Sequence, residues 1–274
     1  MIKANLGSKL SREASAAIEL GAKVHVVRGS VIDYAGSAIV NAANEGCLGG
    51  GGVDGAISNA GGPLLAKARE ALPIIGRGRK RCFTGGSKTT IGGSLPAKFV
   101  IHAVGPNYHV CNDEAEGDLL LYSAYRSAML QARAHGLPDL AFSLLSAGIF
   151  RASKPLKDVL AIGLLAVSAS AYPGLRDVHF VGFTPNEVGT LSALLAELFT
   201  GEGAEAAMAE HVGALAAPLK EMHAAALAES GLASSEPAVG LAVAAFAATA
   251  QPVAGHAGEG AREEPDATSE SESW

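Results

Sequence analysis

Cysteine, net positive charge and long apolar runs are all scarce in this 274-residue sequence. Its three cysteines, Cys47, Cys82 and Cys111, form no CxxC pair and are odd in number. They therefore argue against a disulfide framework and against a structural zinc site. Lys and Arg number 21 against 27 Asp and Glu. The chain thus lacks the overall positive field that captures nucleic acid.

Long apolar segments are missing at both ends of the chain. The N-terminal residues contain no apolar run of the kind that marks a signal peptide. The most apolar late stretch, residues 238–250, has 13 residues, whereas a membrane span needs about 20. We interpret that stretch as a short Ala-rich helix. The sequence predicts a cytoplasmic or nuclear protein with no membrane partner.

Acidic residues are concentrated in the C-terminal part. Residues 256–274 hold six acidic residues and one basic residue, so they carry most of the formal net charge of −6. Residues 201–274 are rich in Ala, Gly, Glu and Ser and show no strand pattern. We predict an Ala-rich C-terminal extension, with a possible helical segment at 201–231 and a largely disordered acidic tail at 232–274.

Strand and helix patterns alternate through the rest of the chain. A helix pattern at 11–20 predicts an N-terminal helical segment within residues 1–22, and a turn is expected at 89–96. The strand patterns cover residues 23–28, 38–40, 98–104, 140–145 and 178–183, and the helix patterns cover 53–60, 63–72, 117–135, 156–171 and 187–199. This order predicts an α/β domain at 23–200, with a mostly parallel sheet, helices on both faces and ligand loops at the carboxyl ends of the strands.

Four consecutive glycines are the most informative local feature. They lie within VNAANEGCLGGGGVDGAISNA, residues 40–60, between a buried strand and the start of a helix. Glycine backbone can approach a ligand closely, and a helix N-terminus adds partial positive charge, so this segment suits a diphosphate. The segment is neither a P-loop nor a GxGxxG dinucleotide motif. A flexible glycine turn is the alternative interpretation.

A second loop of small residues, SAGIFRAS, follows the strand at 140–145. Two such loops can hold a diphosphate from opposite sides. Ile149 and Phe150 would then supply apolar walls for a ribose or a base, although Phe150 is equally explained as a core aromatic.

Four sequence segments, which include these two loops, occur in an order that is typical of a known protein family. VNAAN, GGGGVDGAI, TGGSKTTIGGSLPAKFVIHAVGP and LLSAGIF together resemble the macrodomain family over residues 29 to about 198. GGGGVDGAI and SLPAKFVIHAVGP are similar to the cellular MacroD-type branch, whereas EGDLLLYSAYRSAM and LLSAGIF also resemble viral macrodomains. The resemblance implies a three-layer α/β/α fold with a mixed central sheet that binds ADP-ribose. Many members remove mono-ADP-ribose from modified proteins.

The resemblance also implies roles for individual residues. Asn44 would bind the hydroxyls of the distal ribose, and Asp54 would place or deprotonate the attacking water. From the residues alone, Asp54 is also explained as an acid that stabilises a helix N-terminus. The remaining expected ligand contacts come from the two glycine-containing loops and from the segments after two strands: Ser30, Val31, Asn41, Gly50, Gly51, Gly52, Val53, Ser146, Ala147, Gly148, Ile149 and Phe150. No metal or cofactor is expected.

Three positions depart from the family pattern. Ser30 stands where the family usually has an Asp that binds the adenine amine, so a charge-assisted hydrogen bond worth about 1–2 kcal/mol is lost. Ser58 stands where MacroD-type enzymes commonly have a His. Arg151 replaces a Gly, and it points either inward to pair with a diphosphate or outward as a solvated rim residue, which we favour.

Three functions follow as hypotheses. The first is a hydrolase acting on mono-ADP-ribosylated protein or on O-acetyl-ADP-ribose, which Asn44 and Asp54 favour. The second is an ADP-ribose reader without turnover, which Ser30 and Ser58 favour. The third, a binder of nucleic acid or poly-ADP-ribose, depends only on the basic loop at 77–81, which we interpret as a solvated turn. We expect a monomer and a structural role for His102.

Overall fold

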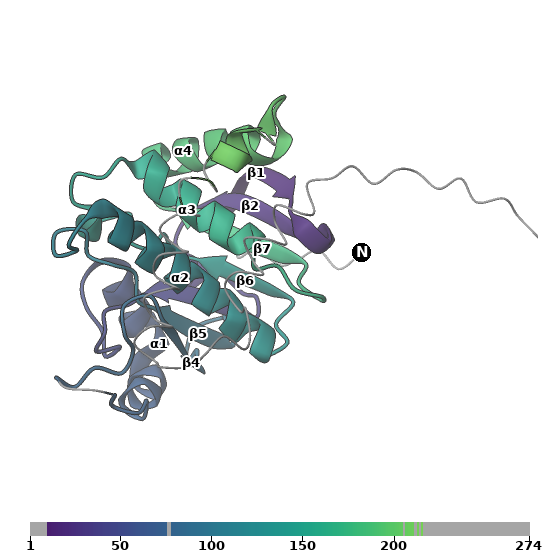
Figure 1. The fold of residues 1–274 in the computed structure, drawn as a ribbon. Coiled ribbons are helices and arrows are strands. Elements are labelled where there is room, and N and C mark those ends of the chain that lie inside the picture. The colour runs from purple at the N-terminus through teal and green to yellow at the C-terminus, as the bar shows by residue number, and fades with distance from the viewer. Residues whose placement is uncertain (1–9, 76–77, 205, 211–212, 214, 216–274) are drawn as a thin grey trace, which may run out of the picture.

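A single mixed sheet forms the centre of the molecule. The computed structural model, shown in Figure 1, describes residues 10–75, 78–204, 206–210, 213 and 215. The described residues form a seven-stranded sheet in the order β1-β2-β7-β6-β3-β5-β4. Its strands are β1 (Ser11–Ala17), β2 (Lys23–Arg28), β3 (Ala38–Ala42), β4 (Ser87–Ile91), β5 (Phe99–Ala103), β6 (Asp139–Phe142) and β7 (Asp177–Gly182).

The five inner strands are parallel and the two edge strands are antiparallel. β2 pairs with β7, β7 with β6, β6 with β3 and β3 with β5, each in parallel. β1 and β4 close the two edges as antiparallel partners of β2 and β5. Both faces of the inner strands are covered, so the middle of each strand is buried, and most of these buried residues are apolar.

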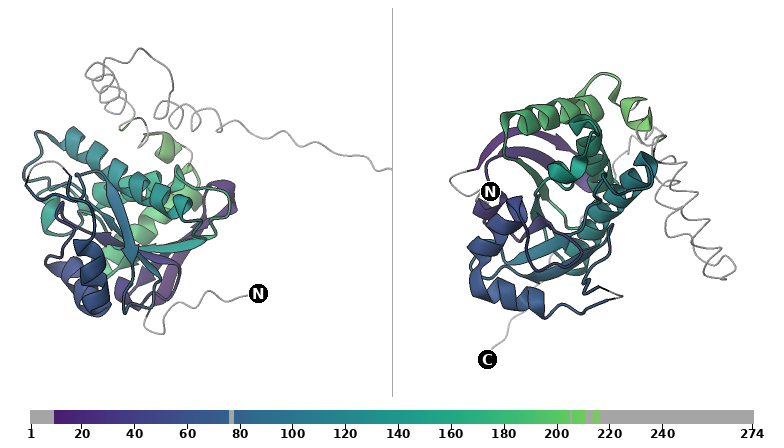
Figure 2. Two further views of the ribbon diagram at one scale, coloured as in Figure 1. Left: turned by 90° about the horizontal axis from the view of Figure 1, so that it is seen from below. Right: turned by 90° about the vertical axis from the view of Figure 1, so that its left-hand side faces the viewer.

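Helices cover both faces of this sheet (Figure 2). The helices are α1 (Gly52–Glu70), α2 (Glu114–Ala134), α3 (Leu156–Ser168) and α4 (Pro185–Leu195), which continues into a π-helical turn at Ala196–Thr200; 3-10 turns lie at Glu19–Gly21, Val31–Asp33 and Ile149–Arg151. Ile39 packs in the core under α1, whereas its neighbour Val40 packs in the core under α2, α3 and α4. This strand alternation separates the two apolar layers, and the expected three-layer α/β/α fold is confirmed.

Two sequence predictions about the sheet edges were wrong. The predicted helix at 11–20 is instead strand β1, because its backbone pairs with β2 along Lys23–Arg28. A lone helix of that length gains little by itself, so pairing with an open sheet edge prevails. The predicted turn at 89–96 begins with the end of β4, whose β-branched Thr89, Thr90 and Ile91 suit a strand paired with β5.

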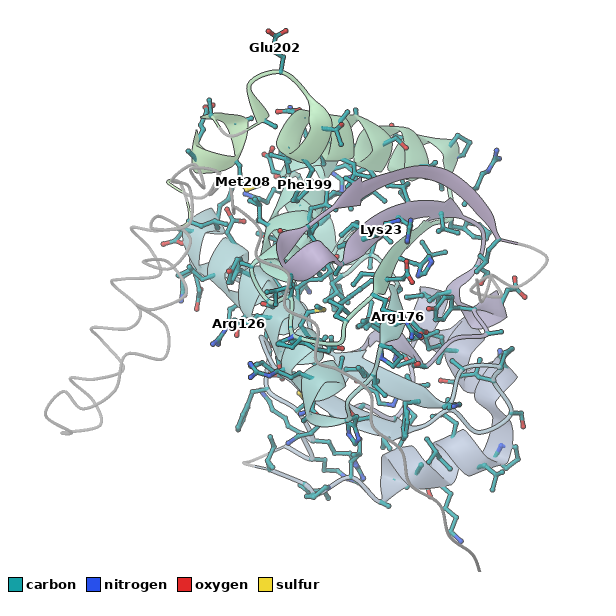
Figure 3. The ribbon with its side chains drawn as sticks, turned by 90° about the vertical axis from the view of Figure 1, so that its right-hand side faces the viewer. Lys23, Arg126, Arg176, Phe199, Glu202 and Met208 are labelled. Carbon is teal, nitrogen blue, oxygen red and sulfur yellow. The ribbon has the colours of Figure 1, made fainter. Side chains whose placement is uncertain are left out.

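The first residues of the C-terminal extension pack on the domain. Ala207 and Met208 lie against the core under α2, α3 and α4, as does Phe199 just before the extension, and Leu215 is buried in this core. Phe199 and Met208 are labelled in Figure 3. Most of the predicted helical segment at 201–231, the tail at 232–274 and residues 1–9 lie outside the described residues. In the part that the structure describes, none of the helices has the length and apolar character of a membrane span.

Helix α1 is broken near its middle. The sequence predicts helices at 53–60 and 63–72, and the structure joins them across Gly62, which has φ 63° and ψ −160°. Pro63 follows the break, and the carbonyl of Gly61 accepts a hydrogen bond from the Ser94 amide at 3.0 Å instead of continuing the helix. The two halves of α1 therefore run in different directions.

Substituting Gly62 by Ala is expected to destabilise the domain. Its dihedral angles belong almost exclusively to glycine, and a side chain there costs about 1–3 kcal/mol. Gly189 in α4 is the matched control, because it has ordinary helical angles and open space around it. Gly189→Ala should stabilise by roughly 0.5–1 kcal/mol. Urea unfolding measures both, and equal effects would show that the break is not a strained feature.

Candidate functional site

Loops from four neighbouring strands meet at one edge of the sheet. Gly29 and Ser30 follow β2, Asn44 follows β3, Ser143 follows β6 and Phe183 follows β7. These strands are parallel, so their carboxyl ends lie at the same edge, which is where open α/β sheets bind ligands. Two cavities open along this edge.

The first, which we call the Ser30 cavity, has a volume of about 390 Å³ and largely apolar walls. Of the described residues that line it, Glu187 alone is charged, and Phe183 is an aromatic side chain that is 76% exposed. The lining residues are Gly29, Ser30, Val31, Gly52, Val53, Ala56, Ser143, Leu144, Ala147, Gly148, Val181, Phe183 and Glu187. This shape and polarity suit a flat ring with a few polar edges.

The second, the Asn44 cavity, is larger and more polar, at about 540 Å³. Its walls combine amides, charged groups and apolar side chains: Asn44, Glu45, Gly46, Gly78, Lys80, Thr84, Val104, Gly105, Pro106, Asn107, Val110, Cys111, Asn112, Glu116, Leu120 and Phe150. Lys80 and Glu45 form an ion pair of 2.6 Å in this wall. Although partial burial opposes it, hydrogen bonding from Lys80 and Thr84 lowers the pKa of Glu45 below its usual value.

The glycine block, residues 49–52, follows Asn44 and Gly46 of the Asn44 cavity in the sequence and ends at Gly52, which lines the Ser30 cavity. The Asn44 side chain braces its start, because Nδ2 donates to the Gly49 carbonyl at 2.9 Å while Oδ1 accepts from the Gly46 amide at 3.0 Å. Helix α1 begins at Gly52, which lines the Ser30 cavity together with Val53. The first turn of a helix thus borders a cavity, and helix N-termini are common anion-binding positions.

The second glycine-containing loop, residues 146–150, also contributes to both cavities. Ala147 and Gly148 line the Ser30 cavity, and Phe150 lines the Asn44 cavity. Ser146 has φ 53° and donates its hydroxyl to the Pro106 carbonyl at 2.7 Å, which fixes the start of the loop. Arg151 donates to the carbonyls of Ala147 and Lys154, so its guanidinium stabilises its own loop.

Asp54 lies beneath the glycine block and is only 3% exposed. Its Oδ1 accepts from the Arg69 guanidinium at 2.6 Å and from Asn41 Nδ2 at 2.8 Å. Its Oδ2 is buried with no hydrogen-bond donor in reach among the described residues. A Cβ on Gly50 would lie 3.2 Å from this Oδ2 and 3.3 Å from Asn44 Nδ2. The free carboxylate oxygen and the Asn44 amide therefore both approach the backbone of Gly50.

A chain of buried hydrogen bonds runs from Asp54 into the sheet. Asn41 Nδ2 lies 3.1 Å from His102 Nδ1, and His102 Nε2 lies 2.9 Å from Thr90 Oγ1. Burial, together with the nearby Arg69 charge, lowers the pKa of His102 to about 3. His102 is therefore neutral near pH 7, accepts at Nδ1 and holds Asn41, which agrees with the structural role expected for it.

The predicted ligand residues divide into two groups. Eight of them line the cavities: Ser30, Val31, Asn44, Gly52, Val53, Ala147, Gly148 and Phe150. Six line neither cavity: Asn41, Gly50, Gly51, Asp54, Ser146 and Ile149. Asn41 and Asp54 are buried in the network below the glycine block, whereas Ile149 is an exposed side chain.

Several contributors were not anticipated from the sequence. Phe183 and Glu187 line the Ser30 cavity, and the signal that could have found Phe183 is an aromatic residue at the carboxyl end of a strand. Lys80 lines the Asn44 cavity, whereas the loop at 77–81 was interpreted as a solvated turn. That interpretation was wrong for Arg81, which is buried; Arg77 lies outside the described residues.

Known proteins resemble this chain in sequence and in fold. The sequence model of the Macro domain matches residues 40–162. A macro domain-containing protein of Cupriavidus necator is 42% identical over 163 residues, which are 60% of this chain and 91% of the relative. The chain belongs to the macro domain family. An O-acetyl-ADP-ribose deacetylase of Escherichia fergusonii is 34% identical to this macro domain over 183 residues, which are 67% of this chain and 98% of that protein.

A solved structure agrees with the fold. The Oceanobacillus iheyensis macrodomain with ADP superimposes on this macro domain with a TM-score of 0.61 and 29% identity, covering 70% of this chain and 98% of that one. The family resemblance drawn from the four sequence blocks is thereby confirmed, and so is the α/β architecture that it implied.

Proposed function

We propose that this macro domain binds ADP-ribose along the carboxyl edge of its sheet and hydrolyses bonds to the distal ribose. The observation that carries the proposal is the buried carboxylate of Asp54, whose unpaired Oδ2 and the Asn44 amide approach the same glycine backbone. The relatives support it, because one is named for O-acetyl-ADP-ribose deacetylation and one was solved with ADP.

The adenine fits the Ser30 cavity. Phe183 offers an exposed ring for stacking, and the apolar walls exclude water from the base. The exocyclic amine of adenine needs an acceptor, and the cavity offers the hydroxyl of Ser30 and the carboxylate of Glu187. Glu187 Oε2 already accepts from the amides of Phe183 and Thr184 at 2.9 and 2.8 Å. The Ser30 hydroxyl is therefore better able than the Glu187 carboxylate to accept a hydrogen bond from the adenine amine.

The diphosphate fits between the glycine block and the loop at 146–150. The amides at the start of α1 provide donors and the positive end of the helix dipole without a lysine. The distal ribose then reaches Asn44, whose amide can both donate to and accept from a vicinal diol. Phe150 lines the same cavity and gives the sugar an apolar surface.

Hydrolysis then proceeds with water beside Asp54. Water supplies a hydroxyl to the reacting carbon as its bond to the leaving oxygen breaks, and the leaving oxygen ends protonated. At the anomeric carbon this passes through an oxocarbenium-like state, which a nearby carboxylate stabilises. A substrate phosphate oxygen can also accept the water proton, so a second protein acid is not required. The Asn44 cavity would hold the acyl group or the modified side chain.

A reader without turnover is the second candidate. It is favoured by the ion pair between Asp54 and Arg69, which occupies one carboxylate oxygen, and by Ser30 at the adenine position. We further propose that the domain acts as a monomer in the cytoplasm or nucleus, with ADP-ribosylated protein as its partner.

Ligand binding gives the first test. ADP-ribose should bind with 1:1 stoichiometry by calorimetry and raise the melting temperature, because it binds the folded state alone. At 100 times the Kd the stabilisation is about 2.7 kcal/mol, or a shift of about 5 to 10 °C. Turnover of an automodified transferase and of O-acetyl-ADP-ribose then separates the hydrolase from the reader. An unchanged melting temperature at millimolar ADP-ribose would contradict both candidates.

A further inference from the structure

A buried arginine lies under the glycine block. Arg69 is 1% exposed, and its guanidinium makes three hydrogen bonds in three directions. Nε donates to the Cys47 carbonyl at 2.5 Å, Nη1 to Ser58 Oγ at 2.7 Å and Nη2 to Asp54 Oδ1 at 2.6 Å. Burying a guanidinium is costly unless its donors are satisfied, so this position is built around the charge.

The break in α1 makes these contacts possible. Arg69 and Asp54 are 15 residues apart in the same helix. In an unbroken helix that separation is about 22 Å along the axis, which exceeds the combined reach of the two side chains. The non-helical angles of Gly62 redirect the second half of α1, and Arg69 returns to the first turn. The GlyGlyPro sequence at 61–63 is therefore part of the site's construction.

The three contacts hold the glycine block from both sides. Cys47 precedes the block, has φ 54° and donates its amide to the Asn44 carbonyl at 3.0 Å. Asp54 and Ser58 follow the block, and Ser58 Oγ donates to the Asp54 carbonyl at 2.7 Å. One side chain thus connects the segment that carries Asn44 with the helical turn that carries Asp54.

The orientation of the Asp54 carboxylate follows from these bonds. Arg69 and Asn41 both bind Oδ1, which leaves Oδ2 directed at Gly50. We propose that Arg69 is the positioning residue of this site: it fixes the Asp54 carboxylate in the orientation that the substrate meets. Its action on turnover rests on the proposed function. Ser58 stands where MacroD-type enzymes commonly have a histidine, and in this chain its Oγ accepts a hydrogen bond from Arg69.

A double-mutant cycle between Arg69→Leu and Asp54→Asn tests the inference. If Arg69 acts through Asp54, Arg69→Leu lowers kcat on the order of 100-fold when Asp54 is present. In the Asp54→Asn background the same change has an effect of about twofold or less. KM and the Kd for ADP-ribose should change far less than kcat. Equal losses of kcat in both backgrounds would mean that Arg69 is only structural.

The same double-mutant cycle can also be measured through melting temperatures in the absence of substrate, which test the coupling of Arg69 and Asp54 independently of turnover. Arg69→Leu leaves a buried carboxylate unpaired, so the double variant should melt at a higher temperature than Arg69→Leu alone. If the decreases in melting temperature of the two single variants simply add in the double variant, the inference is overturned, whether or not the wild type turns over substrate. If the wild type binds ADP-ribose without turnover, hydrolysis fails as the function, and the coupling in melting temperature alone decides the role of Arg69.

Two further variants complete the design. Arg69→Lys keeps the charge but cannot donate in three fixed directions, so it should fold normally and recover only part of kcat. Full recovery would show that the charge alone matters and would overturn the positioning role. Arg81→Leu is the matched control, because Arg81 is also buried and its Nη2 lies 3.4 Å from the Glu70 carbonyl. The decrease in melting temperature caused by Arg81→Leu should simply add to the decrease caused by Asp54→Asn when the two substitutions are combined.

Discussion

Asn44→Ala is expected to lower turnover on the order of 100-fold or more, with a normal fold. Asn44 is exposed, and its side chain bonds only to the local backbone at Gly46 and Gly49 among the described residues. Its removal therefore costs little stability. The reacting ribose loses the amide that orients its hydroxyls, and misorientation of a reacting sugar is expensive in rate. Steady-state turnover of a mono-ADP-ribosylated protein, with melting temperature alongside, measures both effects.

Asn59→Ala provides the matched control for this variant. Asn59 is an exposed asparagine on α1 that lines neither cavity. Its substitution should leave turnover and ligand affinity at the wild-type level. Hydrolysis at the wild-type rate in Asn44→Ala would remove Asn44 from the site and place the distal ribose elsewhere along the sheet edge.

Ser30→Asp is expected to tighten ADP-ribose binding. Ser30 lines the cavity proposed for adenine, and a carboxylate there would accept from the base amine with charge-assisted strength. A gain of about 1–2 kcal/mol corresponds to a Kd that is about 5- to 30-fold lower. Desolvation of the new carboxylate opposes the gain, so alignment with the amine decides its size. Calorimetry on the two proteins measures the difference directly.

An inosine analogue of ADP-ribose, which lacks the amine, tests whether position 30 reads the base. The penalty for the analogue should be larger in Ser30→Asp than in the wild type, because only the variant has a charged acceptor to leave unpaired. Ser30→Ala should bind both ligands with nearly equal affinity. Equal penalties in wild type and Ser30→Asp would mean that the base lies elsewhere in the cavity, and Glu187 would then be the acceptor to test.

Most elements of the fold could be predicted from local sequence patterns. The continuous apolar run at 38–40 and the mostly apolar segment at 98–104 predicted inner strands correctly, because strands covered on both faces are rich in apolar residues. The glycines at 49–52 and the small residues at 146–150 indicated loops at the carboxyl ends of strands, and residues of both loops line the cavities there. The prediction was wrong for the edge strand β1. Its sequence has a helical pattern, but its structure is determined by pairing with β2, and a local pattern contains no information about that partner.

The candidate site was predictable where it is made of backbone, and less so where it depends on distant side chains. Gly52 and Gly148 line a cavity, and this was predictable because glycine backbone can approach a ligand closely. Asp54 was correctly placed in the first turn of a helix, but its partner Arg69 lies four helical turns further along the chain and reaches it only through the break at Gly62. GlyGlyPro predicts a break, although it does not specify the direction in which the chain continues.

The separation of the two cavities has a consequence for molecules that fill only one of them. If ADP-ribose binds as proposed, a nucleoside monophosphate occupies the Ser30 cavity and a ribose phosphate the Asn44 cavity, each at its own cost of immobilisation. Joined through a diphosphate across the glycine block, the two halves pay that cost once, so the whole ligand binds more tightly than the fragments suggest. Affinity should therefore rise more than additively along the series AMP, ADP and ADP-ribose, and the macro domain would select its ligand by length.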